Sequence, residues 1–225
     1  MELVQDTFIW LSDAQEWSGA GATIPQRLLE HLLVTLAVVG IAAAIAIPVG
    51  VIIGHYRVGG NLVAALAGAG RAIPTLGLLT LLGLWIGIGV TAPMIALIVL
   101  AAPPLLAGAY SGVTSVETVT VKAARAIGMS EPQIIGSVEL PLAFPLIIGG
   151  LRSAVVQVVA TATLAAYTAD VGLGRYIFSG LKTRDYGEMI GGSLLVIALA
   201  LVLEAVFSLG LRIRDAHQSR TLLKG

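Results

Sequence analysis

The chain has 225 residues, of which 57% are hydrophobic and 12% charged, and its formal net charge at pH 7 is zero. A soluble domain carries about twice that charged fraction, so the composition excludes an ordinary soluble fold and predicts an all-α, polytopic membrane protein. Zero net charge gives no electrostatic reason to expect a nucleic-acid partner. The absence of cysteine excludes thiolate sites, and His31, His55 and His217 are too far apart in sequence to suggest a metal site.

The first segment, residues 1–30, has mixed polarity. Trp10 and Trp17 lie in it, and indole rings favour the membrane–water interface. We expect an outer or interfacial helix here, or simply two rings that anchor at the headgroups. Residues 1–24 contain acidic residues and no basic start, so we expect no cleavable signal peptide.

Residues 31–211 form the predicted transmembrane domain. A crossing helix needs about 20 apolar residues, and the apolar stretches here predict about five spans. An alternative with six spans would make 61–70 a separate short helix. The five predicted spans cover residues 32–54, about 61–87, 92–113, 142–169 and 189–211.

Basic residues outside the spans indicate the orientation. Cytoplasmic segments carry an excess of Lys and Arg, and with the N-terminus outside the chain has seven such residues inside and four outside. Five spans and a cytoplasmic tail at 212–225 agree with this rule, whereas six spans do not. The inside residues are Arg57, Lys122, Arg125, Arg212, Arg214, Arg220 and Lys224.

A polar segment, residues 115–141, interrupts the spans on the predicted cytoplasmic side, and we call it the coupling loop. Four residues at helical spacing predict an apolar stripe on a short helix, with Lys122 and Arg125 off the stripe. The stripe residues are Val116, Val119, Ala123 and Ile127.

Local signals predict how this segment turns. Gly128 ends the first helix, because glycine readily adopts the left-handed conformation at a helix C-terminus. Ser130 and Gln133 have capping-box spacing, so a second short helix should start at residue 131. Pro141 should mark the start of the fourth membrane helix. Together these signals predict a cytoplasmic helix pair.

A short amphipathic helix by itself favours an interfacial loop with no partner, but the full spacing is more specific. The segment resembles the EAA loop of importer-type ABC permeases. That loop reads E-A-A, three residues, Gly, nine residues, Ile-x-Leu-Pro, and the segment here reads Lys-Ala-Ala, three residues, Gly, nine residues, Val-x-Leu-Pro. That resemblance implies docking into a groove of an ATPase subunit. The residues it implicates are Lys122, Ala123, Ala124, Gly128, Val138, Leu140 and Pro141. Lys122 replaces the family's glutamate, so the acidic contact of that glutamate is not available here.

Three other segments resemble osmoprotectant permeases, in the same order along the chain. They are R-A-I-P-T-L-G-L-L at 71–79, P-P-L-L-A-G-A-Y-S-G-V at 103–113 and G-L-G-R-Y-I-F-S-G at 172–180. Gly108 and Ala109 replace a polar Arg-Asn pair of that family. The resemblance implies import of compatible solutes such as glycine betaine, choline, carnitine or proline betaine.

The family also implies partners and a location. These are two permease subunits, alike or different, two ATPase subunits and an external solute-binding protein, assembled in the lipid bilayer of a bacterial or archaeal cell membrane. The chain has no phosphate-binding loop, so ATP and Mg would be bound by the ATPase, and we expect neither a cofactor nor enzymatic activity in this chain. The alternatives are an importer of an amino acid or another small solute, and a scaffold without transport. The sequence lacks the usual motifs of an intramembrane enzyme.

Charges and prolines inside spans predict a translocation pathway. Such charges are unfavourable in lipid and face the protein interior. Arg152 lies ten residues after Leu142, and Glu204 eight residues before Arg212, which places them about 15 and 12 Å from the same side. We therefore expect an Arg152–Glu204 pair, either static or gating. The other pathway candidates are Arg71, Pro74 and Thr75.

Overall fold

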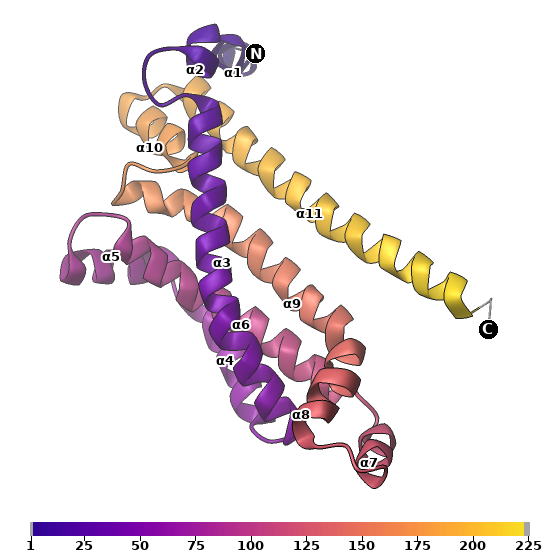
Figure 1. Ribbon diagram of the computed structural model, residues 1–225. Helices are drawn as coiled ribbons and strands as arrows, with labels where there is room; N and C mark the ends of the chain where they lie inside the picture. The colour runs from indigo at the N-terminus through magenta and orange to yellow at the C-terminus, as the bar shows by residue number, and fades with distance from the viewer. Residues whose placement is uncertain (1, 223–225) are drawn as a thin grey trace.

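The computed structural model describes residues 2–222, and the described chain is helical with no strand (Figure 1). The side chains of Arg71 and of residues 212–222 are outside this description, so much of the predicted tail at 212–225 cannot be compared with it. The first helices are α1 (Glu2–Ser12), α2 (Ala14–Ser18), α3 (Ile24–His55), α4 (Gly60–Ala72), α5 (Thr75–Ile86) and α6 (Thr91–Thr114). They are followed by α7 (Thr118–Ala126), α8 (Glu131–Ile134), the π-helical turn η1 (Ile135–Glu139), α9 (Leu140–Thr161), the 3-10 segment η2 (Ala162–Tyr167), α10 (Gly174–Thr183) and α11 (Tyr186–Leu222).

Within the described residues, four helical stretches are long and apolar enough to cross a membrane. They are Ile24–His55, Thr91–Thr114, Glu131–Tyr167 and Tyr186–Leu211. A fifth candidate is the pair α4 and α5, which are bent by 85° relative to each other. The membrane-helix architecture confirms the predicted all-α class, and its four or five spans agree with the predicted number.

The second predicted span is broken at Pro74. Proline has no backbone N–H and disfavours the helical conformation in the residue before it. Ile73 is accordingly extended, with φ −69° and ψ 120°. Helix α4 has 13 residues and α5 has 12, so each is about 20 Å long or less. Neither alone reaches across a hydrocarbon core of about 30 Å.

Helices α3, α6 and α9 form the centre of the bundle, with α6 between the other two. Small residues bring α6 and α9 together: a Cβ built on Gly108 would lie 2.8 Å from the Cα of Gly150. Close backbone approach of this kind is typical of membrane helices. An arginine at position 108, as in the osmoprotectant family pattern, would not fit against Gly150 in this arrangement.

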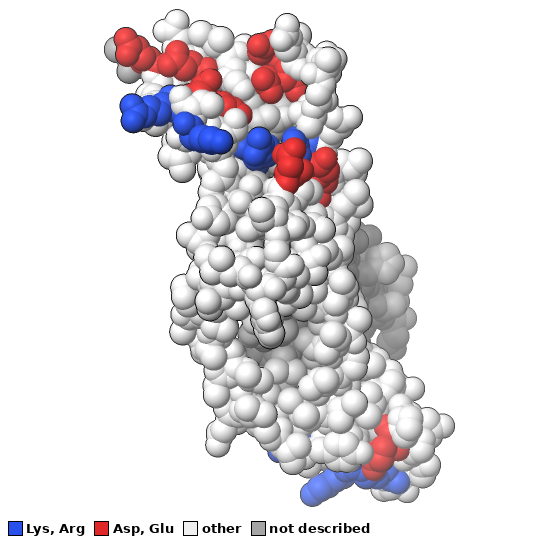
Figure 2. All heavy atoms as spheres, turned by 90° about the vertical axis from the view of Figure 1, so that its left-hand side faces the viewer, with Lys and Arg blue, Asp and Glu red and all other residues white. Residues whose placement is uncertain are grey.

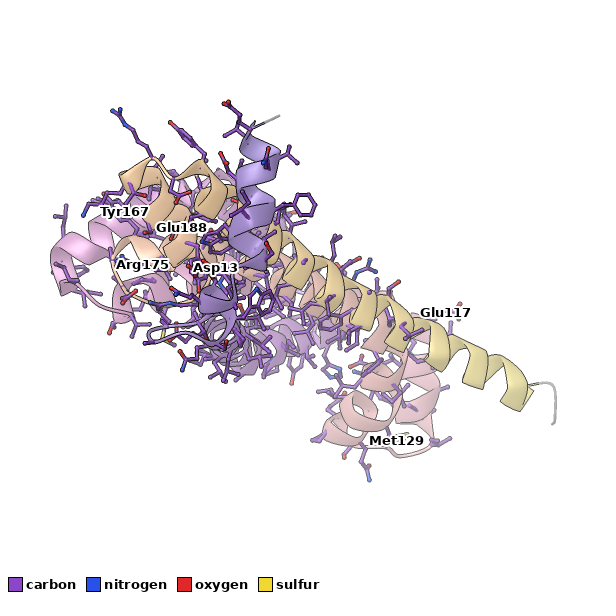
Figure 3. All side chains as sticks on the ribbon, turned by 90° about the horizontal axis from the view of Figure 1, so that it is seen from above. Asp13, Glu117, Met129, Tyr167, Arg175 and Glu188 are labelled. Carbon is purple, nitrogen blue, oxygen red and sulfur yellow. The ribbon has the colours of Figure 1, made fainter. Side chains whose placement is uncertain are left out.

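The charged side chains gather at two ends of the visible face, with an uncharged region between them (Figure 2). One end contains α1, α2 and α10, and the other contains α7 and α8 (Figure 1). The view from above separates the same two ends, with Asp13, Arg175 and Glu188 over one and Met129 at the tip of the other (Figure 3). This distribution is what a protein embedded in a bilayer requires, since charge is excluded from the hydrocarbon core.

Helix α11 diverges from the bundle toward its C-terminal end (Figure 1). Its first part contacts α1 and α10, whereas apolar side chains farther along, including Leu201, Val206 and Leu209, are exposed. At the other end, the ring of Trp10 packs edge-on against Tyr176, with centroids 5.0 Å apart. An interfacial position for the N-terminal segment remains a prediction.

Candidate functional site

The coupling loop folds as two short helices around a glycine turn. Gly128 has φ +90°, in the left-handed region that glycine adopts without strain. A Cβ built there would meet nothing within 4 Å, so the requirement for glycine is conformational. Ser130 N–H donates to Gln133 Oε1 at 2.8 Å in a capping box at the start of α8. The helix pair, its turn and its cap are therefore confirmed.

The predicted apolar stripe on the first helix is present only in part: Val119, Ala123 and Ile127 share one side of α7, but Val116 is not on it, and Lys122 lies on that side instead of off it. The buried face of α7 consists of Val121 and Ala124, which pack with Val116 and Ile134 in a small core of the loop itself. Val119 is 74% exposed and Ile127 is 79% exposed. The physical reason is the start of the helix: Val116 precedes Thr118, where α7 begins, so it does not fix the helical phase of the residues that follow.

The opposite face of α7 is therefore an exposed, largely apolar surface. Its residues follow the spacing i, i+3, i+4, i+7 and i+8, which places them on one side of a helix. We call this surface the α7 face. It consists of Val119, Lys122, Ala123, Ala126 and Ile127. Of the predicted coupling residues, Lys122 and Ala123 thus face outward, whereas Ala124 is buried.

The last predicted coupling residues lie where the loop joins α9. Leu140 N–H donates to the carbonyl of Ile135, five residues back, which is the π-helical pattern. The α-helix restarts at Leu140, next to Pro141 as predicted, but the chain from α8 to α9 is one continuous helix without a loop. Val138 packs against the core of the loop, and Leu140 against a cluster of α3, α6 and α9. These two side chains anchor the loop to the bundle.

Sequence reasoning missed a buried ionic cluster next to this joint. His55, the last residue of α3, has a side chain with 0% exposure, and its Nδ1 lies 2.6 Å from Glu139 Oε2. Its Nε2 lies 3.0 Å from Glu131 Oε2. Glu131 in turn accepts from Arg125 Nε and Nη2 at 2.7 and 2.9 Å. Because 84 residues separate His55 from Glu139, only their positions at the ends of two predicted helices could have suggested the contact.

A second contact ties the same turn to the other end of the coupling loop. Arg57, which has φ +54°, lies two residues after the end of α3. Its Nη2 donates to the carbonyl of Val116 at 2.6 Å, and its Nη1 to that of Thr114 at 3.2 Å. The end of α3 and the turn after it are therefore attached to both ends of the coupling loop, through Arg57 at the start of the loop and through His55 at its end.

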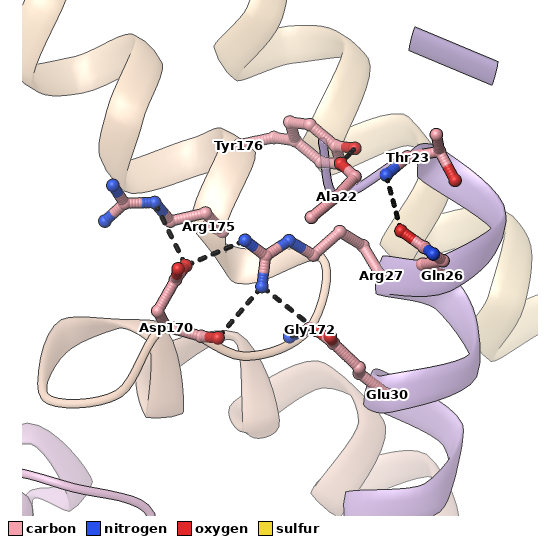
Figure 4. A network of polar contacts seen from close by, with 9 residues as sticks. All are labelled: Ala22, Thr23, Gln26, Arg27, Glu30, Asp170, Gly172, Arg175 and Tyr176. Atoms are coloured by element: carbon pink, nitrogen blue, oxygen red, sulfur yellow. Dashed lines mark hydrogen bonds and ion pairs between the residues drawn. The ribbon is translucent and has the colours of Figure 1, made fainter. Parts of the chain in front are cut away.

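The end of the molecule that contains α1, α2 and α10 holds a separate polar network (Figure 4). Arg27 donates to the carbonyl of Asp170 at 2.9 Å and to its Oδ1 at 2.8 Å. Arg27 also pairs with Glu30 at 3.0 Å, and Glu30 Oε2 accepts from Gly172 N–H at 2.9 Å. Arg175 Nε lies 3.3 Å from Asp170 Oδ1. The network fixes the loop after η2 to α3, and it pairs Arg27 and Arg175, two of the four basic residues that lie outside in the predicted orientation.

Tyr176 extends this network toward the N-terminal segment. Its hydroxyl donates to the carbonyl of Ala22 at 3.2 Å (Figure 4). Burial, followed by the nearby carboxylate of Glu16, raises the pKa of Tyr176 to about 12. The phenol therefore stays protonated and able to donate at physiological pH.

The predicted pathway residues do not all come together. Arg152 Nε donates to Glu204 Oε2 at 2.8 Å, and Nη2 contacts Oε1, so the pair expected from matching depths is present between α9 and α11. Pro74 and Thr75 lie at the break between α4 and α5. The side chain of Arg71 is outside the described part of the structure. Whether any of these residues line a pathway stays a prediction.

A groove with a volume of ≈ 360 Å³ lies beside the α4–α5 break. It is formed by α3, α4 and α6, and the residues that line it are aliphatic, among them Ile45, Leu66 and Pro103. An aliphatic lining offers no group that would recognise a charged solute.

Comparison with known proteins gives the context for these features. Residues 46–220 match the family model described as binding-protein-dependent transport system inner membrane component. The carnitine transport permease protein OpuCB of Listeria monocytogenes is 34% identical over 80% of this chain and 82% of that protein. The choline transport system permease protein OpuBB of Bacillus subtilis is 29% identical over 85% of this chain and 88% of that protein.

The fold is also similar to a solved structure, an inward-facing conformation of the MetNI methionine ABC transporter. The TM-score is 0.70 at 21% identity, and the match covers 92% of this chain and 97% of the other. At this identity the likeness shows the fold alone. Together with the family match, it leads to one conclusion: the chain belongs to the family of binding-protein-dependent transport system inner membrane components, with the fold of an importer-type ABC permease.

Proposed function

We propose that this chain is the membrane subunit of an ATP-driven importer of quaternary ammonium osmoprotectants, and that the α7 face is where a partner ATPase docks. The observation that carries the proposal is this exposed apolar helix face at a charged end of a membrane protein. An unpartnered apolar face on a short helix is a typical anchor for a groove on another protein. Ala123 and Ala126 have small side chains, which would allow a partner backbone to approach closely.

Lys122 gives this surface an unusual charge. It lies on the exposed side of α7, where the family pattern has a glutamate. A lysine in the middle of an apolar face favours a partner groove that carries an acidic side chain. We expect the cognate ATPase to differ from others of its class at that position.

The distribution of basic residues supports an orientation with α7 and α8 in the cytoplasm and the N-terminus outside. In that orientation the outer network of Arg27 and Asp170 would face an external solute-binding protein. A second permease subunit would complete the pathway and cover apolar surface such as that of α11. ATP and Mg would be bound by the ATPase, and this chain would contribute movement of its helices.

The substrate class rests on the relatives, whose names specify carnitine and choline transport. Quaternary ammonium groups are typically recognised by aromatic faces, and the aliphatic groove beside α4 offers none. We therefore assign most of the solute selectivity to the external binding protein. An amino acid or another small solute is the alternative, because the coupling loop is common to importers of many substrates.

The test is uptake by the complete complex in proteoliposomes. Labelled glycine betaine, choline, carnitine and proline are offered with the external binding protein, with and without ATP inside the compartment that holds the ATPase. We expect ATP-dependent uptake of one or more of the quaternary ammonium solutes. Uptake of proline alone would refute the substrate class and keep the permease function, whereas an inability to bind any ATPase would refute both.

A further inference from the structure

The ionic cluster at the inner end of α3 joins the coupling loop to the first membrane helix. His55 ends α3, Glu131 begins α8, and Glu139 ends the π-helical turn η1. His55 and Glu139 are almost completely buried, at 6% and 2% exposure. Replacing a buried ion pair by apolar residues is often neutral or stabilising, so stability alone gives little reason for ionisable groups at this position.

The chemistry of the three side chains favours a charged histidine. An ionised carboxylate can only accept hydrogen bonds, and a neutral imidazole has one N–H, whereas an imidazolium has two. Both ring nitrogens of His55 face carboxylate oxygens, Glu139 Oε2 at 2.6 Å and Glu131 Oε2 at 3.0 Å. A neutral ring would therefore leave an unprotonated nitrogen 2.6 or 3.0 Å from a carboxylate oxygen.

The two arms of this contact differ. The Nδ1 arm to Glu139 is a short hydrogen bond, as expected of a charge-assisted pair. The Nε2 arm to Glu131 is within ion-pair distance but outside hydrogen-bond geometry, so it is an electrostatic attraction. Arg125 from α7 balances Glu131, and the ring of Tyr56 packs edge-on against His55. Counting an imidazolium, the cluster has two positive and two negative groups.

The location of the cluster suggests what it does. The α7 face is exposed, so a partner can displace α7. The core of the loop connects α7 to Val138 of η1, and α8, η1 and α9 are one continuous helix. A displacement of α7 is therefore transmitted to η1. Helices that contact each other through apolar side chains can slide with little loss of interaction energy, because such contacts are not directional. A charged hydrogen bond instead fixes the distance between its donor and acceptor atoms. Arg57 holds the entry of the loop to the same α3–α4 turn. Movement of the loop must therefore either move this turn or break the cluster.

We propose that protonated His55 is a positioning residue that transmits movement of the coupling loop to α3 and the α3–α4 turn. This inference rests on the proposed function, since it requires an ATPase that moves the loop. It makes coupling between ATP hydrolysis and transport depend on the charge of one buried histidine.

The test compares wild type with His55→Gln in the complete complex in proteoliposomes, with the ratio of solute transported to ATP hydrolysed as the readout. We expect the ratio to fall at least about fivefold in His55→Gln, the lower range of measured couplings between sites. ATPase copurification should persist, because the α7 face is unchanged.

The matched control is His31→Gln. His31 is buried in the same helix, and its Nε2 lies 2.9 Å from the carbonyl of Val159. We expect His31→Gln to keep the wild-type ratio of solute transported to ATP hydrolysed. If His55→Gln does not assemble, the double variant His55→Leu/Glu139→Leu removes both buried charges and should still be decoupled. A wild-type ratio in His55→Gln or, failing its assembly, in the double variant would overturn the inference and leave the proposed function intact. A wild-type complex without solute-stimulated ATP hydrolysis would overturn both.

Discussion

The two ends of helix α3 are both held by charged side chains, but in different environments. At its N-terminal end, Arg27 is buried while its partners Asp170 and Glu30 remain partly open to water. At its C-terminal end, His55 and Glu139 are both buried. Removing the partner of a carboxylate that water can reach costs little stability, whereas a buried carboxylate is left uncompensated. The network at the N-terminal end is therefore suited to fix a loop, and the cluster at the C-terminal end to transmit a displacement.

The first prediction tests this difference through stability. Glu139→Leu leaves the imidazolium of His55 buried without its partner, and we expect a loss of about 3 kcal/mol or more in the free energy of unfolding. Arg27→Leu leaves carboxylates that water can solvate, and we expect a loss of about 1.5 kcal/mol. Thermal denaturation in detergent measures both. Equal losses would show that the two ends do not differ as proposed.

The second prediction concerns the turn of the coupling loop. Gly128→Val forces a branched residue into the left-handed region, at a cost of about 1–3 kcal/mol. Gly128→Asn is the matched control, because asparagine tolerates this conformation better. We expect membrane insertion to survive and transport and ATPase association to fall together in the valine variant. Normal transport by well-expressed Gly128→Val would refute the role of the turn.

The third prediction concerns the Arg152–Glu204 pair, which joins α9 to α11. Arg152→Leu and Glu204→Leu should each destabilise the protein more than the double replacement does, because each single change leaves an unpaired charge. We expect a coupling free energy of about 1 kcal/mol from a double-mutant cycle on assembly in detergent. Additive effects would show that the contact contributes nothing to stability.

The smallest effect on stability is expected at the α7 face. Ile127→Asp should change the free energy of unfolding by about 0.5 kcal/mol or less, because the side chain is exposed. Copurification of the ATPase should nevertheless decrease strongly. Val121→Asp, on the buried face, is the contrasting variant and should destabilise the loop itself. Retention of the ATPase by Ile127→Asp would place the docking surface elsewhere.

Much of this molecule follows from local sequence. The apolar stretches predicted the spans, the turn at Gly128 and the cap at Ser130 were predicted from single residues, and matched depths predicted the contact of Arg152 with Glu204. Each of these features depends on properties of one segment, such as its hydrophobicity, the φ preference of glycine or the rise of a helix. The family resemblance was likewise contained in short motifs.

Only the tertiary structure decided which faces and which distant residues meet. The place of Val116 in the apolar stripe was predicted incorrectly, because Val116 lies before α7 begins, and only the packing of α8 against α7 decided which side of α7 is buried. The need for a small residue at position 108 becomes clear only from the close approach of Gly150. The contact of His55 likewise becomes clear only from the position of Glu139, 84 residues away. The sequence by itself determined which segments are helical and that the protein lies in a membrane. Only the packing of α3 against the coupling loop determined the buried contact of His55 with Glu139, because contacts between distant residues depend on how whole helices are placed.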